Sequence, residues 1–155
     1  MARLSVNLNK IALLRNARHT GVPSIVQFAE RSYSAGAWGI TLHPRPDERH
    51  IRRSDIAELA AVIAPWRAEF EYNIEGYPDA RLFELVEAVT QEQVTLVPDS
   101  PGAFTSDEGW RLDDPQIASL FEAVGRLRRL GSRVILFIDP DPTVVDPRPV
   151  LTAWN

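Results

Sequence analysis

Residues 39–50 read GITLHPRPDERH, an apolar run that stops abruptly at His43. A short apolar and β-branched run that ends at a proline is typical of a buried strand. The residues that close the stretch include two histidines, two arginines, an aspartate and a glutamate. A solvated loop and the rim of an active site both fit this composition, so the rest of the chain has to decide between them.

The same change from apolar strand to polar loop recurs along the chain. Segments with helical spacing of apolar residues lie between the strand-like segments, and Ser24, Ser54 and Gly131 are suited to cap them. Strands are expected at 4–8, 38–43, 68–74, 93–98 and 133–139, and helices at 24–36, 54–65, 78–89 and 113–131.

Five strands that alternate with four helices predict an α/β fold, in which a parallel sheet is flanked by helices. An open doubly wound sheet and a partial TIM (β/α)8 barrel both fit this order of elements. Periodicity cannot choose between the two, because the βα units of both folds look alike. No glycine-rich phosphate-binding motif of the nucleotide-binding proteins follows any of the strands.

Composition excludes several classes of protein. The chain has 155 residues, which is the length of one domain, and its net charge of −4 argues against a nucleic-acid binder. It contains no cysteine, so disulfides and thiolate metal sites are excluded. No apolar run is long enough to span a membrane and the first residues do not resemble a signal peptide, so we expect a cytoplasmic protein.

Polar side chains gather where the expected strands end. In a parallel sheet these ends meet at one edge, which is where α/β folds assemble their sites. A lone histidine at a strand end is more often structural, but recurrence at successive strands favours a site. The residues concerned include Asn7, Asn9, Lys10 and Arg18 after the first strand, His43, Arg45 and His50 after the second, Glu75 after the third and Thr105 after the fourth.

The chemistry available at this edge is proton transfer close to cationic groups. His43 ends an apolar strand, so we expect a shielded imidazole that titrates near neutral pH. Glu75 ends the neighbouring strand, where a partly apolar environment raises the proton affinity of a carboxylate. Arg18, Arg45 and His50 are suited to bind phosphate. These residues predict an enzyme for small phosphorylated carbonyl compounds that uses no metal, because the spacing of the two histidines does not match a tight metal-ligand pattern.

Five segments, in order along nearly the whole chain, resemble the pyridoxine 5′-phosphate synthases, the enzymes that close the pyridine ring of vitamin B6. The second segment is the most specific, because its pattern of histidines and charges directly follows a strand. The segments are VNLNKIALLRNAR (6–18), GITLHPRPDERHI (39–51), NIEG (73–76), LVPD (96–99) and TSDEGW (105–110).

The resemblance implies a TIM barrel that forms homo-oligomers and needs no metal or organic cofactor. It implies condensation of 1-deoxy-D-xylulose 5-phosphate with 3-amino-2-oxopropyl phosphate, with release of inorganic phosphate and water. His43 and Glu75 resemble acid/base residues of the family. Asn9 and Lys10 stand where many members have Asp and His. The positions that resemble substrate-binding residues are Asn7, Asn9, Lys10, Arg18, Arg45, His50 and Thr105.

The length of the chain departs from the family, because a complete barrel needs about 250 residues. We therefore expect a partial barrel in residues 1–142 and an irregular, proline-rich tail in residues 143–155. Its first and fifth strands would each have an unpaired edge, and its apolar interior would be open on one side. A truncated product, a half-barrel that dimerises and a barrel completed by a second chain all fit this prediction.

The expected activity follows from the same length. A partial barrel would lack a third acid/base residue of the family and most of the phosphate-binding loops, so we expect this chain alone to be inactive. The alternative hypothesis is a non-catalytic partial barrel that binds sugar phosphates or acts as an interaction protein.

Overall fold

The computed structural model describes residues 3–18, 20–99, 108–111 and 117–140. Its centre is a sheet of five strands in the order β1-β2-β3-β4-β5, and every neighbouring pair is parallel. The predicted parallel sheet is therefore confirmed, with β1 and β5 as its outer strands. The strands are β1 (Ser5–Asn7), β2 (Gly39–Leu42), β3 (Glu71–Gly76), β4 (Gln93–Leu96) and β5 (Arg133–Leu136).

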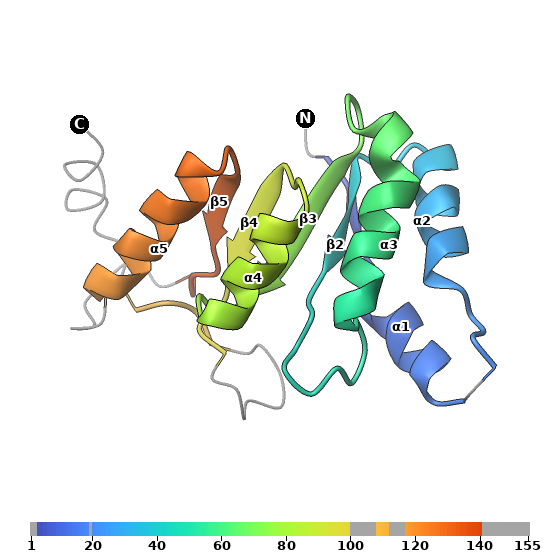
Figure 1. The fold of residues 1–155 in the computed structure, drawn as a ribbon, viewed down its shortest axis with the longest axis horizontal. Coiled ribbons are helices and arrows are strands. Elements are labelled where there is room, and N and C mark those ends of the chain that lie inside the picture. The colour runs from blue at the N-terminus through green and yellow to red at the C-terminus, as the bar shows by residue number, and fades with distance from the viewer. Residues whose placement is uncertain (1–2, 19, 100–107, 112–116, 141–155) are drawn as a thin grey trace.

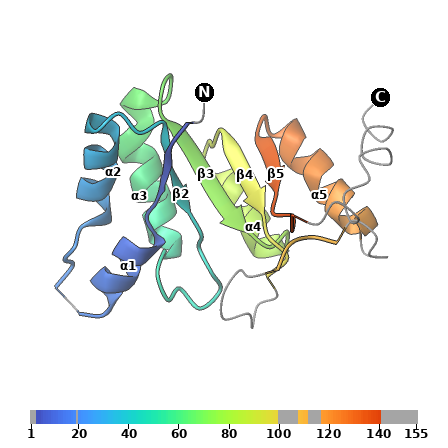
Figure 2. The same ribbon diagram turned by 180° about the vertical axis from the view of Figure 1, so that it is seen from behind.

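Helices cover one face of this sheet (Figure 1), and the described residues place no helix over the other face (Figure 2). A doubly wound sheet has helices on both faces, so the sequential strand order and the one-sided cover fit a partial βα barrel. Among the described helices, none has the length and apolar character needed to cross a bilayer. The helices are α1 (Asn9–Asn16), α2 (Ile25–Ser34), α3 (Arg53–Ile63), α4 (Ala80–Ala88), α5 (Ile117–Arg129) and the 3-10 turn η1 (Ala64–Trp66).

The hydrophobic core lies between the sheet and this layer of helices. Ile40 of β2, Ile74 of β3 and Leu59 of α3 are fully buried there. Tyr72 of β3 also points toward the helices, because its hydroxyl donates a 2.8 Å hydrogen bond to the carbonyl of Ile56 in α3. Since side chains alternate along a strand, the neighbours of Tyr72 and Ile74 must point to the open face of the sheet.

Local signals explain where most helices begin and end. Ser24 accepts a hydrogen bond from the backbone N–H of Gln27 and caps α2, as predicted, and Gly131 after α5 has a positive φ of 86°. The prediction that Ser54 caps the next helix is wrong, because Ser54 lies inside α3. The carboxylate of Asp55 instead accepts from the N–H of Arg52, which satisfies the start of that helix.

The open face of the sheet carries a chain of polar side chains. Ser5 hydrogen-bonds Thr41 at 2.8 Å, Asn73 donates to Thr41 at 3.1 Å, and Thr95 donates to Asn73 at 3.0 Å. The predicted apolar interior is therefore wrong for β1 to β4. These polar groups hydrogen-bond one another, which lets this face be polar without leaving them unpaired. β5 differs, since its Ile135 is 41% exposed.

Replacing Leu59 by alanine should destabilise the protein by about 2–5 kcal/mol, because the side chain is fully buried between α3 and the sheet. Leu14→Ala on α1 is the matched control, since that leucine is 59% exposed and its loss should change stability by less than about 0.5 kcal/mol. Urea unfolding measures both values. Equal losses from the two substitutions would contradict the position of the core.

Candidate active site

His43 directly follows β2, so the sheet fixes its position. Its backbone N–H donates a 2.9 Å hydrogen bond to the side-chain oxygen of Asn9, and the N–H of Asn9 donates to the side-chain oxygen of Asn7 at 2.9 Å. Asn7 is the last residue of β1 and pairs with Thr41 of β2. The two asparagines therefore join the ends of β1 and β2, and they hold the backbone of His43 at this edge of the sheet.

Glu75 lies near the end of β3, on the open face of the sheet. It belongs to the same alternating set as Asn73, and it pairs with Thr95 of β4. The side-chain amide of Asn7 donates to its carboxylate at 3.4 Å, so the ends of β1 and β3 are in contact at the side-chain level. The sequence analysis expects Glu75 to end this strand, and in the structure β3 continues only one residue further, to Gly76.

One cavity of about 470 Å³ is lined by both His43 and Glu75. It also contains most of the predicted substrate-binding residues: Asn7, Asn9, Lys10, Arg45 and His50. Arg18 does not line this cavity; it is exposed beyond the end of α1. Thr105 lies outside the described residues.

Three apolar residues line the cavity that sequence reasoning did not assign to it: Leu13, Val97 and Phe137. Arg49, one of the two arginines in the polar stretch after the second strand, also lines it. Val97 could have been found from alternation, since Thr95 points to the open face and Val97 is two residues further along. Leu13 could not have been found in this way, because the helix α1 was not predicted. These apolar residues add a wall suited to the carbon skeleton of a ligand.

A larger hollow of about 790 Å³ lies on the helical side of the sheet, between α4 and α5. Phe83, Phe121 and Glu122 are among its lining residues, and no histidine lines it. Its Arg126 forms an exposed ion pair with Glu87. The cavity at His43 and Glu75 is the better candidate, because acid/base groups and cations meet there at the carboxyl edge of a parallel sheet.

Burial, together with the positive charges of Arg45 and Arg81 and the neighbouring His50, lowers the pKa of His43 to about 3. The prediction of a near-neutral pKa is therefore wrong, because burial disfavours the charged imidazolium more strongly than expected and the cationic side chains act in the same direction. The pKa of His50 is lowered to about 4, again mainly by burial. Both imidazoles are neutral at pH 7 in the unliganded protein.

Glu75 shows the opposite shift, as its partly apolar position predicts. Burial and the negative charge of Asp99 raise its pKa to about 7, and the hydrogen bond from Asn7 lowers it slightly. A carboxyl group with this pKa is present in both its acid and its base form at neutral pH. It can therefore give up a proton and take one back.

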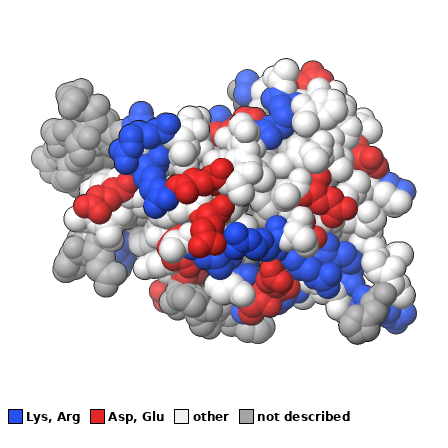
Figure 3. Space-filling model, in the orientation of Figure 1, with Lys and Arg blue, Asp and Glu red and all other residues white. Residues whose placement is uncertain are grey.

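Two arginines lie beside His43, of which Arg45 is buried and Arg81 is half-buried. Arg45 donates a 2.5 Å hydrogen bond to Asp99, which follows β4, and both side chains are only 7% exposed. Arg81 of α4 donates to the backbone carbonyl of Pro44. Figure 3, seen from the helical side, shows Lys and Arg side chains in the lower right part of the molecule, with Asp and Glu side chains among them. At the cavity itself, Lys10, Arg45 and Arg49 favour an anionic ligand.

A metal site was not expected. In the part of the chain that the structure describes, no cluster of three or more His, Cys, Asp or Glu side chains is arranged to hold a metal ion. The groups at this site are acids, bases and hydrogen-bond donors.

The pKa of Glu75 should be about 7 when its carboxyl carbon is followed by NMR during a pH titration. Asp99→Asn should lower this pKa, because it removes the negative charge that raises it. Asn7→Ala should raise it, because it removes the hydrogen bond to the carboxylate. A Glu75 pKa near 4.5 in the parent protein, or no response to Asp99→Asn, would contradict this description of the site.

The protein should lose stability as the pH falls from 6.5 toward 4. His43 and His50 have folded pKa values below that of the unfolded chain, so their contribution is complete above pH 6.5 and is lost on acidification. His43→Asn should reduce this slope by up to about 1.4 kcal/mol per pH unit. Urea unfolding at several pH values measures it.

Val124→Ala is the control for this experiment, because it truncates a buried side chain of α5 and leaves the titrating groups unchanged. It should lower the free energy of unfolding by a similar amount at every pH. Parallel curves for the parent and His43→Asn would show that the imidazole of His43 is not buried in its neutral form. Glu75 has the opposite pH dependence, but it is the same in both proteins and cancels from the comparison.

Comparison with known protein sequences identifies the family of the chain. A sequence model of the pyridoxal phosphate biosynthesis protein PdxJ matches residues 4–152. The chain is 50% identical over 139 residues to a pyridoxine 5′-phosphate synthase of Chelativorans sp. (strain BNC1), with 90% of this chain and 56% of the relative covered. It is 48% identical over 149 residues to that of Albidiferax ferrireducens, with 92% and 58% covered.

A pyridoxine 5′-phosphate synthase of Mesorhizobium japonicum is 50% identical over 141 residues, with 91% of this chain and 57% of the relative covered. The chain thus spans between 56% and 58% of the length of these curated relatives. The matched region includes both His43 and Glu75. By this match and these identities, the chain belongs to the PdxJ family of pyridoxal phosphate biosynthesis proteins.

Proposed function

We propose that the chain supplies the His43–Glu75 cavity of a pyridoxine 5′-phosphate synthase. The reaction joins 1-deoxy-D-xylulose 5-phosphate to 3-amino-2-oxopropyl phosphate and releases inorganic phosphate and water. The observation that carries the proposal is the meeting of an imidazole, a carboxyl group and several cations in one cavity. Membership of the PdxJ family supports the choice of reaction.

Phosphate binding is assigned to the cationic side of the cavity. Arg45, Arg49 and Lys10 line it, and a guanidinium group can donate two parallel hydrogen bonds to a phosphate. The ion pair between Arg45 and Asp99 fixes the direction of one guanidinium before a ligand arrives. Such preorganisation reduces the entropy cost of binding.

Proton transfer is assigned first to Glu75. Condensation of an amine with a ketone forms a C=N bond and expels the carbonyl oxygen as water. The nitrogen must lose protons and the oxygen must gain them, so one group that both accepts and donates can serve the step. A carboxyl group with a pKa of about 7 does this at neutral pH.

His43 is assigned a role that depends on the bound substrate. With a pKa of about 3 its imidazole is a poor base, because it is buried among positive charges. A phosphate dianion next to Arg45 would offset these charges and raise the proton affinity of His43. Substrate binding would therefore turn His43 into an effective base. We also propose that no metal or organic cofactor takes part, and that the chain forms a homo-oligomer.

Arg45→Gln should weaken the binding of 1-deoxy-D-xylulose 5-phosphate to the chain by at least about tenfold, because a hydrogen bond to a charged group contributes about 1.5–3 kcal/mol. Calorimetry on the 155-residue protein measures the affinity. Arg126→Gln is the matched control, since that arginine is paired with Glu87 on the surface away from the cavity. Its affinity should equal that of the parent.

Lys10→Gln provides a second variant whose folding is not in question, because Lys10 is exposed. It should also weaken binding. A folded parent that does not bind the sugar phosphate would contradict the proposal. Chromatography of a mixture with both substrates then tests turnover by the chain alone: pyridoxine 5′-phosphate would exclude the non-catalytic hypothesis, whereas binding without product agrees both with that hypothesis and with the expected inactivity of this chain on its own.

A further inference from the structure

We propose that Arg15, Asn16 and Asp55 form a positioning network that fixes the loop after β2 and presents His50 to the cavity as a hydrogen-bond donor through Nε2. These three residues do not line the cavity. The identity of the ligand that His50 would meet rests on the proposed function. The position of His50 itself rests on contacts within this chain.

The network begins with a buried ion pair between two helices. Arg15 of α1 donates two hydrogen bonds to the carboxylate of Asp55 in α3, each of 2.8 Å. The two side chains are only 10% and 5% exposed. Nε of Arg15 also donates to the side-chain oxygen of Asn16 at 3.1 Å, which fixes the orientation of that amide. The pair therefore determines where the donor group of Asn16 points.

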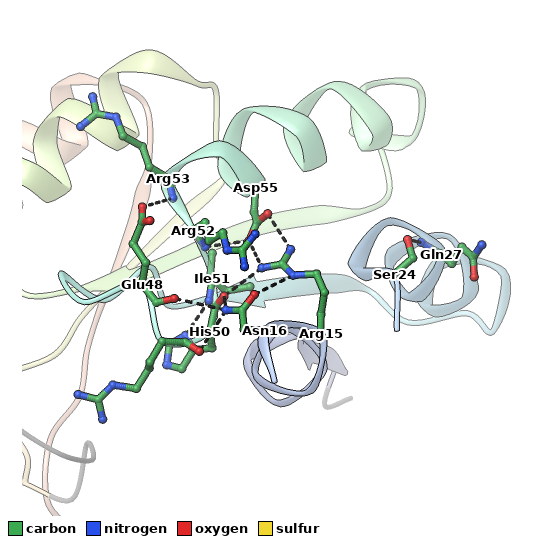
Figure 4. Close-up of polar contacts among 11 residues, drawn as sticks. Arg15, Asn16, Ser24, Gln27, Glu48, His50, Ile51, Arg52, Arg53 and Asp55 are labelled. Carbon is green, nitrogen blue, oxygen red and sulfur yellow. Dashed lines mark hydrogen bonds and ion pairs between the residues drawn. The ribbon is translucent and has the colours of Figure 1, made fainter. Parts of the chain in front are cut away.

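The amide of Asn16 points at the backbone of the loop after β2 (Figure 4). Its Nδ2 lies 2.8 Å from the carbonyl oxygen of His50, 3.1 Å from that of Arg49 and 3.3 Å from that of Glu48. Arg15 donates to the carbonyl of His50 as well, at 3.1 Å. Three consecutive carbonyls thus face the network, and the one of His50 accepts from both side chains.

The loop needs such support, because its backbone conformation is an unusual one. Glu48 has a φ of +51°, a left-handed conformation that residues with a side chain rarely adopt. Its carboxylate accepts a 2.8 Å hydrogen bond from the N–H of Arg53 at the start of α3. This contact and Asn16 hold Glu48 from two sides, so residues from two helices stabilise the shape of the loop.

The ring of His50 is fixed at one nitrogen. The backbone N–H of Ile51 donates to its Nδ1 at 2.9 Å, so Nδ1 acts as an acceptor. A neutral imidazole whose Nδ1 accepts must carry its proton on Nε2. Burial lowers the pKa of His50 to about 4, so the ring is neutral at pH 7. His50 lines the cavity, where its ring centroid lies 6.1 Å from that of His43.

Stability of the fold alone does not explain why Arg15 and Asp55 form a buried ion pair. Removing two charges from water is unfavourable, and a well-packed apolar pair in the same place is often as stable. Apolar side chains could not donate to the carbonyl of His50. The specific contribution of Arg15 and Asp55 is therefore to the position of the loop.

The direct test is the tautomer of His50 in the ¹⁵N-histidine-labelled chain, observed by NMR. The chain has three histidines, and His50→Gln assigns the signal. The parent should show only the form with the proton on Nε2. Asn16→Ala should give a mixture of both neutral forms and bind 1-deoxy-D-xylulose 5-phosphate at least about fivefold more weakly. Val124→Ala, a small truncation in α5, should retain the parent tautomer and affinity.

Arg15→Lys is the second variant, because lysine keeps the charge but cannot form the two parallel hydrogen bonds to Asp55. It should change the tautomer in the same direction as Asn16→Ala. A single Nε2 tautomer and unchanged affinity in a folded Asn16→Ala or Arg15→Lys variant would overturn the inference. If the parent does not bind the sugar phosphate but the tautomer changes as stated, the proposed function fails and the positioning role stands.

Discussion

The parallel, in-register pairing of β1, β2 and β3 is the constraint on which the site depends. Asn7 pairs with Thr41, and Thr41 pairs with Asn73, so the three strands reach the same edge of the sheet together. Acid/base groups that are far apart in sequence, His43 and Glu75, are thereby placed in one cavity. An antiparallel arrangement would send neighbouring strand ends to opposite edges and would separate them.

The surroundings at this edge of the sheet shift the pKa values of His43 and Glu75 in opposite directions. Burial and the cationic groups around His43 lower its pKa, while burial and Asp99 raise the pKa of Glu75. The carboxyl group can thus transfer a proton at neutral pH before a ligand binds. In the proposed function, a bound anion that offsets the arginines would make the imidazole a stronger base, so the acid/base chemistry would depend on the phosphorylated ligand.

The fold could be predicted from the sequence where one face of each element is clearly apolar. The strand at Gly39–Leu42 and the helix that ends before Gly131 are examples, because their patterns are unambiguous. The helix α1 was missed, since it is short, has no side-chain cap and exposes Leu14. The predicted bounds of the third strand begin and end too early in the sequence. Its side chains on the open face, Glu71 and Glu75, are polar and do not mark the strand as an apolar run would.

The location of the site could also be predicted, because strand ends meet at one edge of a parallel sheet. The pKa of His43 could not, since its largest cause is burial, which the tertiary packing decides, and since Arg81 adds its charge from a helix that is remote in sequence. The role of Arg15 and Asp55 was equally hidden, as their contact joins two helices that no local pattern relates.

The most direct measurement of the central claim is an NMR titration with 1-deoxy-D-xylulose 5-phosphate that follows the backbone amides of the whole chain. The account predicts that the largest shifts occur at Asn9, His43, His50 and Gly76, around the carboxyl ends of β1 to β3. Shifts concentrated at Phe83 and Ser119, which line the hollow between α4 and α5, would contradict it. So would saturating binding that leaves the amide of His43 unperturbed.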